Sequence, residues 1–195
     1  MHINQHMNDF VINMLKSEIP STYYYHNYEH SLYVIQKAAE IGYYENCSDK
    51  ELELLHVAAL WHDTGYVNIY KGHEEASCRL ARQYLPGYGY NHDDIERICG
   101  MIMATKIPQS PKNKLEEILA DADLEYLGTA NAAVLANGLF NELKALNPLL
   151  TEEEWNKTEI KFLSSHSFFT GYCKETKEQA KQVYLNSLTN KNILH

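Results

Sequence analysis

Residues 52–66, LELLHVAALWHDTGY, are the stretch that decides the fold. An apolar run with helical spacing leads into the dipeptide His62-Asp63, and a glycine follows two positions later. Just upstream, Ser48 and Glu51 have the spacing of a capping box, which predicts where this helix begins. A histidine and an acid behind an apolar helix face are costly to desolvate unless they are paired or bound to an ion. The rest of the chain must therefore supply their partners.

Helical periodicity continues through most of the chain. Apolar residues at i, i+3, i+4 spacing run from Ile3 to Leu15 and stop at Pro20, and Thr151 with Glu154 forms a second capping box. No segment alternates with a period of two between hairpin turns, so no strand is expected. The pattern predicts an all-α single domain over residues 1–195, a compact helical bundle. Further helices are expected at 28–41, 73–85, 93–105, 113–127, 129–146, 151–169 and 175–188, and the longest loops at 64–72, 86–92 and 106–112.

Length and composition exclude several classes of protein. A chain of 195 residues has room for one sizeable core, and its 45% hydrophobic content is typical of a globular domain. The net charge of −9, with no long Lys/Arg run, argues against binding to a nucleic-acid polymer. No apolar run reaches the ~18 residues of a membrane span. With no leader-like N-terminus, we expect a cytoplasmic protein that does not engage the membrane. Its four scattered cysteines should be reduced and mostly buried: Cys47, Cys78, Cys99 and Cys173.

Two other segments carry residues that could partner His62-Asp63. ILADADLEYLG, residues 118–128, places Asp121 and Asp123 inside an apolar helix, where carboxylates meet the same desolvation cost. YYYHNYEHSLYV, residues 23–34, places His26 and His30 one helical turn apart. By themselves, these histidines fit an aromatic helix start equally well. A divalent cation held by two imidazoles and two carboxylates would resolve the cost, and this donor set suits Mn, Fe, Co, Ni or Zn better than Mg.

The order His, then His-Asp, then Asp on a helical background resembles the HD-domain superfamily of metal-dependent phosphohydrolases. The core of that family is a bundle of helices around a metal held by an H…HD…D motif. The resemblance implies that His30, His62, Asp63 and Asp123 are the metal ligands, with Asp121 as the second candidate for the last one. It covers about two-thirds of the chain. It implies an HD-domain-like bundle with a metal-site core at about 20–128 and closing helices at about 129–190.

The first motif, YHNYEH, is similar to the Tyr-His-Asn-x-x-His motif of the cyclic nucleotide phosphodiesterase branch. That similarity implies that His26 is the general acid, and a histidine pKa near neutrality suits proton delivery. It makes Asn27 a residue that orients its neighbours at the substrate side. Asp63 has a catalytic role as well, because a ligand carboxylate could also hold the attacking water.

Three more residues are predicted near the substrate. Tyr66 follows the His-Asp dipeptide and could line the pocket, and Lys106 could offer a positive charge to a phosphate. A lysine at a helix end is more often a solvated partner of the helix dipole. For His73 the sequence favours neither of two roles: a residue on the substrate side, or a histidine at a helix start with no catalytic part.

The metal content is predicted to be one divalent ion. Some branches of the family hold a second metal through a histidine in an Ile-x-x-His-Thr context. The corresponding stretch here is MIMATK, residues 101–106, with Ala104 before the threonine. The sequence therefore does not predict a second metal ion.

The function predicted is hydrolysis of a small phosphate ester, a nucleotide or a related phosphomonoester or diester, by metal-activated water. The alternatives are an HD-fold oxygenase or lyase, and a catalytically silent HD-fold sensing module. The partner is then a small phosphorylated substrate, and the apolar helices at both ends leave a homodimer open. The basic residues Lys174, Lys177 and Lys181 are interpreted as a solvated helix face rather than a phosphate-binding patch. His56 is expected in the core or behind the site, and the remaining histidines have no motif support: His2, His6, His92, His166 and His195.

Overall fold

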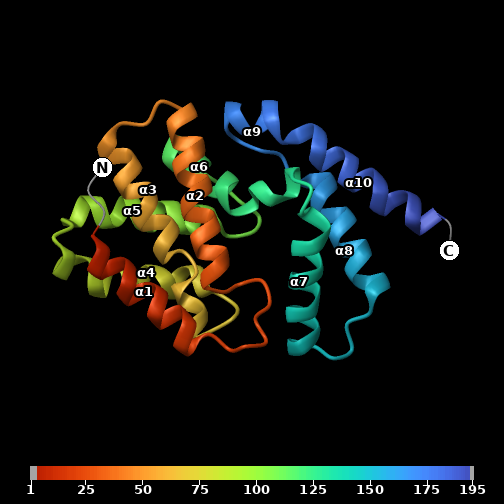
Figure 1. Ribbon diagram of the computed structural model, residues 1–195, viewed down its shortest axis with the longest axis horizontal. Helices are drawn as coiled ribbons and strands as arrows, with labels where there is room; N and C mark the ends of the chain where they lie inside the picture. The colour runs from red at the N-terminus through yellow and green to blue at the C-terminus, as the bar shows by residue number, and fades with distance from the viewer. Residues whose placement is uncertain (1–3, 194–195) are drawn as a thin grey trace.

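A computed structural model describes residues 4–193, and it is helical with no strand in that range. The predicted all-α bundle is confirmed (Figure 1). Ile3, His2 and His195 lie outside the described residues. The α-helices are α1 (Gln5–Glu18), α2 (Tyr28–Tyr44), α3 (Asp49–Trp61), α4 (His73–Tyr84), α5 (His92–Ala104), α6 (Lys114–Leu124), α7 (Ala132–Leu146), α8 (Glu152–Ser165), α9 (Gly171–Thr176) and α10 (Glu178–Ile193). Three short 3-10 helices join them: η1 (Thr64–Val67), η2 (Leu85–Tyr88) and η3 (Glu125–Gly128).

Helix α3 is the centre of the core. Its residues from Leu54 onward are apolar around most of the helix, and all but His56 are buried, as expected for a helix with neighbours on every side. Helices α2, α5 and α6 pack directly on it. Figure 1 shows α1–α6 in one half of the molecule and α7–α10 in the other, with η3 passing between them. The central helix therefore ends, at His62, deep inside the protein.

Side-chain caps set several helix starts. Ser48 and Thr151 each form the predicted capping box. The carboxylates of Glu51 and Glu154 accept from the backbone N–H groups of these two cap residues. Asn27 caps α2 by accepting from the backbone N–H groups of Glu29 and His30. Since a cap satisfies N–H groups that have no helical partner, it fixes where the chain enters the helix.

The helix predicted over 151–169 was too long. Helix α8 ends at Ser165, and the backbone N–H groups of Phe169 and Thr170 instead donate to the buried carboxylate of Asp121. Thr170 then caps a short helix, α9, most of which lies between the helices predicted at 151–169 and 175–188. A tertiary hydrogen bond from a residue about fifty positions away decided this boundary.

The interpretation of the C-terminal lysines as a solvated face was wrong for two of the three. Lys181 is fully buried, where its ammonium donates to the His166 carbonyl at 2.6 Å and pairs with Glu178. Lys177 forms an ion pair with the fully buried Glu125. Lys174 remains exposed. Lys181 thus ties α10 to the loop after α8, and Lys177, at the junction of α9 and α10, ties that junction to η3.

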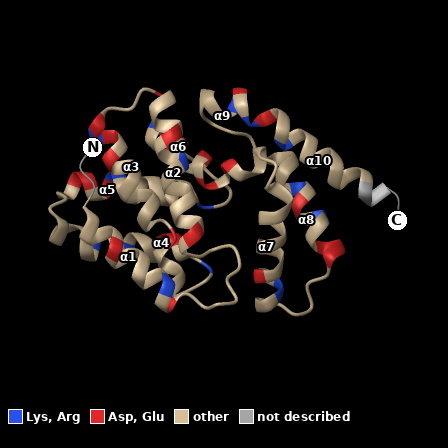
Figure 2. Cartoon of the chain, in the orientation of Figure 1, with Lys and Arg blue, Asp and Glu red and all other residues tan. Residues whose placement is uncertain are grey.

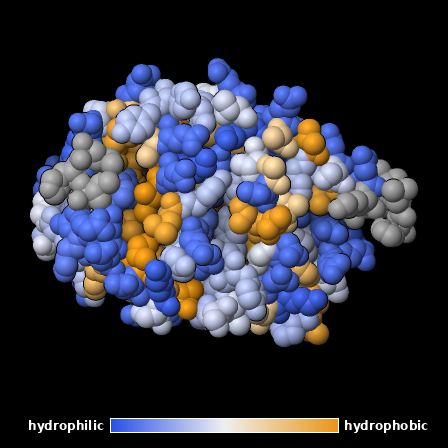
Figure 3. All heavy atoms as spheres, in the orientation of Figure 1, coloured by the Kyte–Doolittle hydropathy of each residue, from blue (hydrophilic) through white to orange (hydrophobic). Residues whose placement is uncertain are grey.

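Charged residues of both signs are interspersed over the helices, with no basic stripe in this view (Figure 2). The same face is mostly hydrophilic, with small apolar patches in the left half and near the centre (Figure 3). No helix among the described residues has both the length and the apolar character needed to cross a bilayer.

Candidate metal centre

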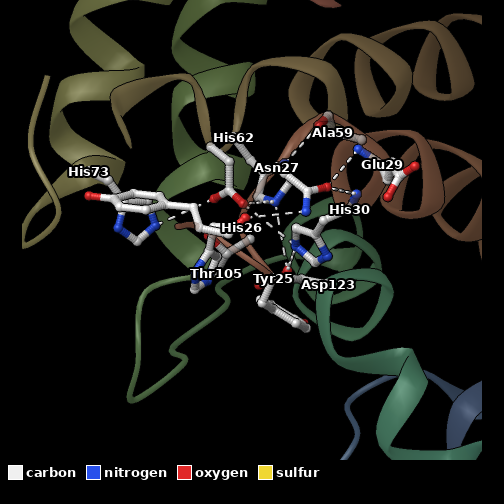
Figure 4. Close-up of polar contacts among 12 residues, drawn as sticks. Tyr25, His26, Asn27, Glu29, His30, Ala59, His62, His73, Thr105 and Asp123 are labelled. Carbon is white, nitrogen blue, oxygen red and sulfur yellow. Dashed lines mark hydrogen bonds and ion pairs between the residues drawn. The ribbon is translucent and has the colours of Figure 1, made fainter. Parts of the chain in front are cut away.

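Three helices bring the predicted ligands together. His30 comes from the first turn of α2, His62 and Asp63 from the end of α3, and Asp123 from the last turn of α6 (Figure 4). His30 Nε2 lies 2.9 Å from Asp123 Oδ1. The ligand atoms of His30, His62 and Asp123 lie within 4.8 Å of one another. Residues 93 positions apart thus meet in a cluster small enough to surround one ion.

Asp63 completes this cluster from the α3 side. Its Oδ2 lies 3.2 Å from His62 Nε2 and 3.6 Å from His30 Nε2. Yet Asp63 Oδ2 and His62 Nε2 are both buried without a hydrogen-bond partner among the described residues. Buried polar atoms are normally satisfied, so two unpartnered ligand-type atoms facing each other indicate a cation site. The four side chains fit a divalent metal.

The orientation of His62 supports the same conclusion. Its Nδ1 lies 2.7 Å from the Ala59 carbonyl oxygen, to which it can only donate. In the neutral ring the proton is then on Nδ1, and the lone pair of Nε2 points into the cluster. A backbone acceptor behind a histidine is the usual way to fix the tautomer of a metal ligand.

The electrostatics of the cluster favour positive charge. Burial alone would raise the pKa of Asp63, but neighbouring histidines, His62 foremost, lower it well below its usual range. Burial likewise opposes ionisation of Asp123, and the hydrogen bond to His30 and the nearby His62 ring lower its pKa as well. Burial would lower the pKa of His62, but the two carboxylates raise it. The carboxylates are thus held ionised, and a cation could replace the protons on the imidazoles.

The second candidate ligand, Asp121, is used elsewhere. Its side chain is fully buried and accepts from Phe169 N, Thr170 N and Thr170 Oγ1 at 2.6–3.2 Å. Two residues along a helix turn the side chain by about 200°, so Asp121 and Asp123 face opposite ways. Asp121 anchors the loop before α9, and Asp123 faces the histidines.

His26 has a partner that the sequence did not reveal. Its Nδ1 lies 2.5 Å from Oε1 of Glu142 in α7, and its backbone N–H donates to the other carboxylate oxygen at 2.9 Å. Tyr25 N and Tyr70 Oη also donate to this fully buried carboxylate. Burial would lower the pKa of His26, but Glu142 and the acids of the cluster raise it. The sequence offered one sign of this partner: Glu142 is an acid that lies on the same helix face as the half-buried Leu135 and Leu139.

The other predicted residues lie around this centre in different ways. Tyr66 is buried between His26 and His73, with ring centroids 4.4 Å and 3.9 Å away. His73 Nε2 lies 3.5 Å from Asp63 Oδ1, on the side away from His30. Lys106 lines the cavity that opens onto this centre, described below, and forms an ion pair with Glu75.

Asn27 is placed less favourably for substrate contact. Its carboxamide oxygen is taken by the N–H groups at the start of α2, and its amide nitrogen lies 3.4 Å from the Tyr23 carbonyl. His56 bonds Asn8 of α1, away from the cluster, as expected of a core histidine.

A cavity of about 1030 Å³ opens onto the cluster. His26, Asp63 and Asp123 lie in its wall. Charged side chains and His73 line the part next to α4 and α5: the basic residues Lys71, Arg79 and Lys106, and the acids Glu74 and Glu75. Apolar side chains from α6, η3, α7 and α8 line the other part: Leu124, Leu127, Ala136, Leu139, Trp155 and Phe162. A volume of this size can hold a ligand as large as a nucleotide.

Comparisons with known proteins agree with this geometry. The family model described as HD domain matches residues 27–125, about half of the chain. A crystal structure of a predicted HD superfamily hydrolase from an uncultured Thermotogales bacterium is 19% identical with a TM-score of 0.63, covering 99% of this chain and 98% of that chain. The structure of Bacillus subtilis YpgQ in complex with ADP is 18% identical with a TM-score of 0.66, covering 96% and 93%. No curated protein matches the chain significantly.

Proposed function

Because this chain belongs to the HD domain family, we propose that it is a metal-dependent phosphohydrolase that cleaves a small phosphate ester. The substrate is a nucleotide or a related phosphomonoester or diester. The observation that carries the proposal is the pair of orphaned buried atoms, His62 Nε2 and Asp63 Oδ2, next to His30 and Asp123. Such a group is costly without a cation and favourable with one.

The ion would be held by His30, His62, Asp63 and Asp123. When bound, a divalent cation supplies Lewis acidity and a positive centre for an anionic phosphate. This local charge matters because the protein carries a net charge of −9. The cationic residues of the cavity, Lys71, Arg79 and Lys106, would attract the remaining phosphate oxygens.

His26 would deliver a proton to the leaving oxygen. Because Glu142 holds Nδ1, the atom left to donate is Nε2, on a ring that lies in the cavity wall. The carboxylate stabilises the protonated ring, as an acid catalyst near neutral pH requires. Asp63 has a second oxygen, Oδ1, which could orient the attacking water while Oδ2 faces the histidines.

A nucleoside phosphate is the substrate class that we favour. The cavity combines a part that carries three basic side chains, Lys71, Arg79 and Lys106, with an apolar part, which fits a molecule with a phosphate at one end and a base at the other. The ADP bound to the B. subtilis structure is of this class.

The test begins with metal analysis of the purified protein. It continues with a screen for phosphate release from nucleotides and sugar phosphates in the presence of Mn²⁺, Mg²⁺, Co²⁺ or Ni²⁺. We expect about one divalent ion per chain and metal-dependent release. The double variant H62A/D63A should lose both metal and activity while its helical circular dichroism persists. Unchanged metal content in that variant would overturn the proposal, and two irons per chain would favour an oxygenase instead.

A further inference from the structure

The apolar part of the cavity contains one acidic side chain, Glu159 of α8. It is 7% exposed and lies in the cavity wall beside Trp155 and Phe162. Its Oε1 accepts from Tyr184 Oη at 2.5 Å. Among the side chains that the structure describes, no donor bonds Oε2. Oε2 is not among the fully buried unpartnered atoms, so it is accessible from the cavity, where a donor group of a ligand could bond it in place of water.

Two tyrosines, Tyr25 and Tyr126, line the cavity together with this carboxylate and with Asp63 and Asp123 of the metal cluster. Tyr25 packs on His30 with ring centroids 4.6 Å apart, and Tyr126 packs on Tyr25 at 5.5 Å. Tyr126 therefore continues from the cluster side of the cavity wall, through Tyr25, toward the wall that also holds Glu159. A ligand with its phosphate at the cluster would therefore extend past the tyrosines, with its other end among Trp155, Phe162 and Glu159.

We propose that Glu159 is the base-recognition residue of this site and that it selects guanine among nucleoside phosphates. The inference rests on the proposed function for the phosphate end of the ligand. A planar heterocycle fits an apolar wall with two aromatic side chains. Guanine presents two adjacent N–H donors, N1–H and the N2 amino group, which match the two oxygens of a carboxylate.

The other bases match less well. Adenine and cytosine each offer a single amino group at the corresponding edge, so one carboxylate oxygen stays without a donor. Uracil and thymine offer one N–H between two carbonyl oxygens, which the carboxylate repels. The predicted order is guanine first, adenine and cytosine next, and uracil and thymine last.

The first experiment measures kcat/KM of the metal-loaded enzyme for the 5′-phosphates of guanosine, adenosine, cytidine and uridine. We expect kcat/KM for guanosine 5′-phosphate to exceed that for uridine 5′-phosphate by about 10- to 100-fold, because charge-assisted hydrogen bonds contribute a free energy of this size. In E159Q this ratio should fall to near one, because a glutamine presents one acceptor and one donor in place of two acceptors.

The control is Y184F, which removes the bond between α8 and α10 but keeps the carboxylate. The guanosine-to-uridine ratio should persist in Y184F. If Y184F removes the ratio as fully as E159Q does, Glu159 acts only by tying the two helices together, and the proposal is wrong.

A second experiment separates this proposal from the hydrolytic function. Calorimetric titration with the nucleosides guanosine and uridine, which carry no phosphate, tests the base site alone. Tighter binding of guanosine, lost in E159Q, supports base recognition whether or not the protein hydrolyses phosphates. Metal-dependent hydrolysis with no preference among bases, and equal affinity for the two nucleosides, would overturn the proposal and leave the proposed function standing.

Discussion

His26 Nδ1 lies 2.5 Å from Oε1 of Glu142, although the two residues are 116 positions apart. The same carboxylate accepts the His26 backbone N–H, so it fixes both the ring and the chain that carries it. We predict that E142Q lowers kcat by about 10- to 100-fold, because an acid catalyst that loses its orientation loses much of its contribution. Steady-state kinetics with metal analysis checks this.

The matched control for that variant is Y70F. Tyr70 Oη also donates to Glu142, but it does not hold the histidine. Its loss should change kcat by less than the loss of Glu142 does. Equal kcat in E142Q and the wild type, at equal metal content, would contradict a positioning role for Glu142.

Asp123 and Asp121 lie two residues apart and should fail in different ways when changed to asparagine. D123N should weaken metal binding by at least about tenfold, with little loss of stability when both proteins are compared free of metal. D121N should keep its metal but lose about 2 to 4 kcal/mol of unfolding free energy, since three buried donors lose a charged acceptor. Metal titration and urea unfolding of both variants separate the two roles. Weaker metal binding in D121N but not in D123N would make Asp121 the metal ligand instead of Asp123.

Metal binding should stabilise the fold. The two carboxylates and two imidazoles converge in the folded protein and are far apart in the unfolded chain. At a free metal concentration about 100 times Kd, the gain is about 2.7 kcal/mol, which corresponds to a rise in Tm of about 5–10 °C. Differential scanning calorimetry with and without Mn²⁺ tests it. The rise should vanish in H62A/D63A, and an equal rise there would place the metal elsewhere.

Stability should fall in mild acid because of His166, which lies far from the metal centre. Burial and then the charge of Lys181 lower the pKa of His166 from 6.5 to about 4. Between these values the unfolded chain binds a proton that the folded protein does not, so stability decreases as pH falls below about 6.5. The loss at pH 5 is about 1 to 2 kcal/mol.

Urea unfolding of chelator-treated protein at pH 7.5 and pH 5 measures this loss. Other groups also titrate over this range, so the informative quantity is the difference between the wild type and H166Q. The variant should lose less stability on acidification. Identical losses in the two proteins would show that His166 does not contribute.

Gly65 should tolerate no side chain. A Cβ atom there would lie 2.0 Å from the His73 carbonyl oxygen, because η1 and the start of α4 touch at this point. We expect G65A to cost about 2–3 kcal/mol and to disturb His73. Gly87 has nothing within 4 Å of the corresponding position, so G87A should stay within about 0.5 kcal/mol of the wild type. Thermal unfolding of the two variants gives the comparison, and equal Tm values would contradict the close contact.

The sequence predicted the fold class because helical periodicity and caps are local. The capping boxes at Ser48 and Thr151 form as predicted, and the apolar run before His62 is the buried central helix. The boundary of α8 was not predictable in this way, since the acceptor that ends it, Asp121, comes from another helix. The same holds for Lys181, whose burial depends on the loop after α8.

The sequence by itself also determined which residues assemble at the centre. The order of His30, His62-Asp63 and Asp123 along the chain named them through its resemblance to the H…HD…D motif, while the cost of burying a carboxylate is the same for Asp121. Only the tertiary structure decided what surrounds them. The helices after residue 128 read as packing elements, yet they bring Glu142 to His26 and Glu159 to the cavity wall. The reason is physical: a lone acid in an amphipathic helix has no local signature of its partner, which depends on how the two halves of the bundle pack.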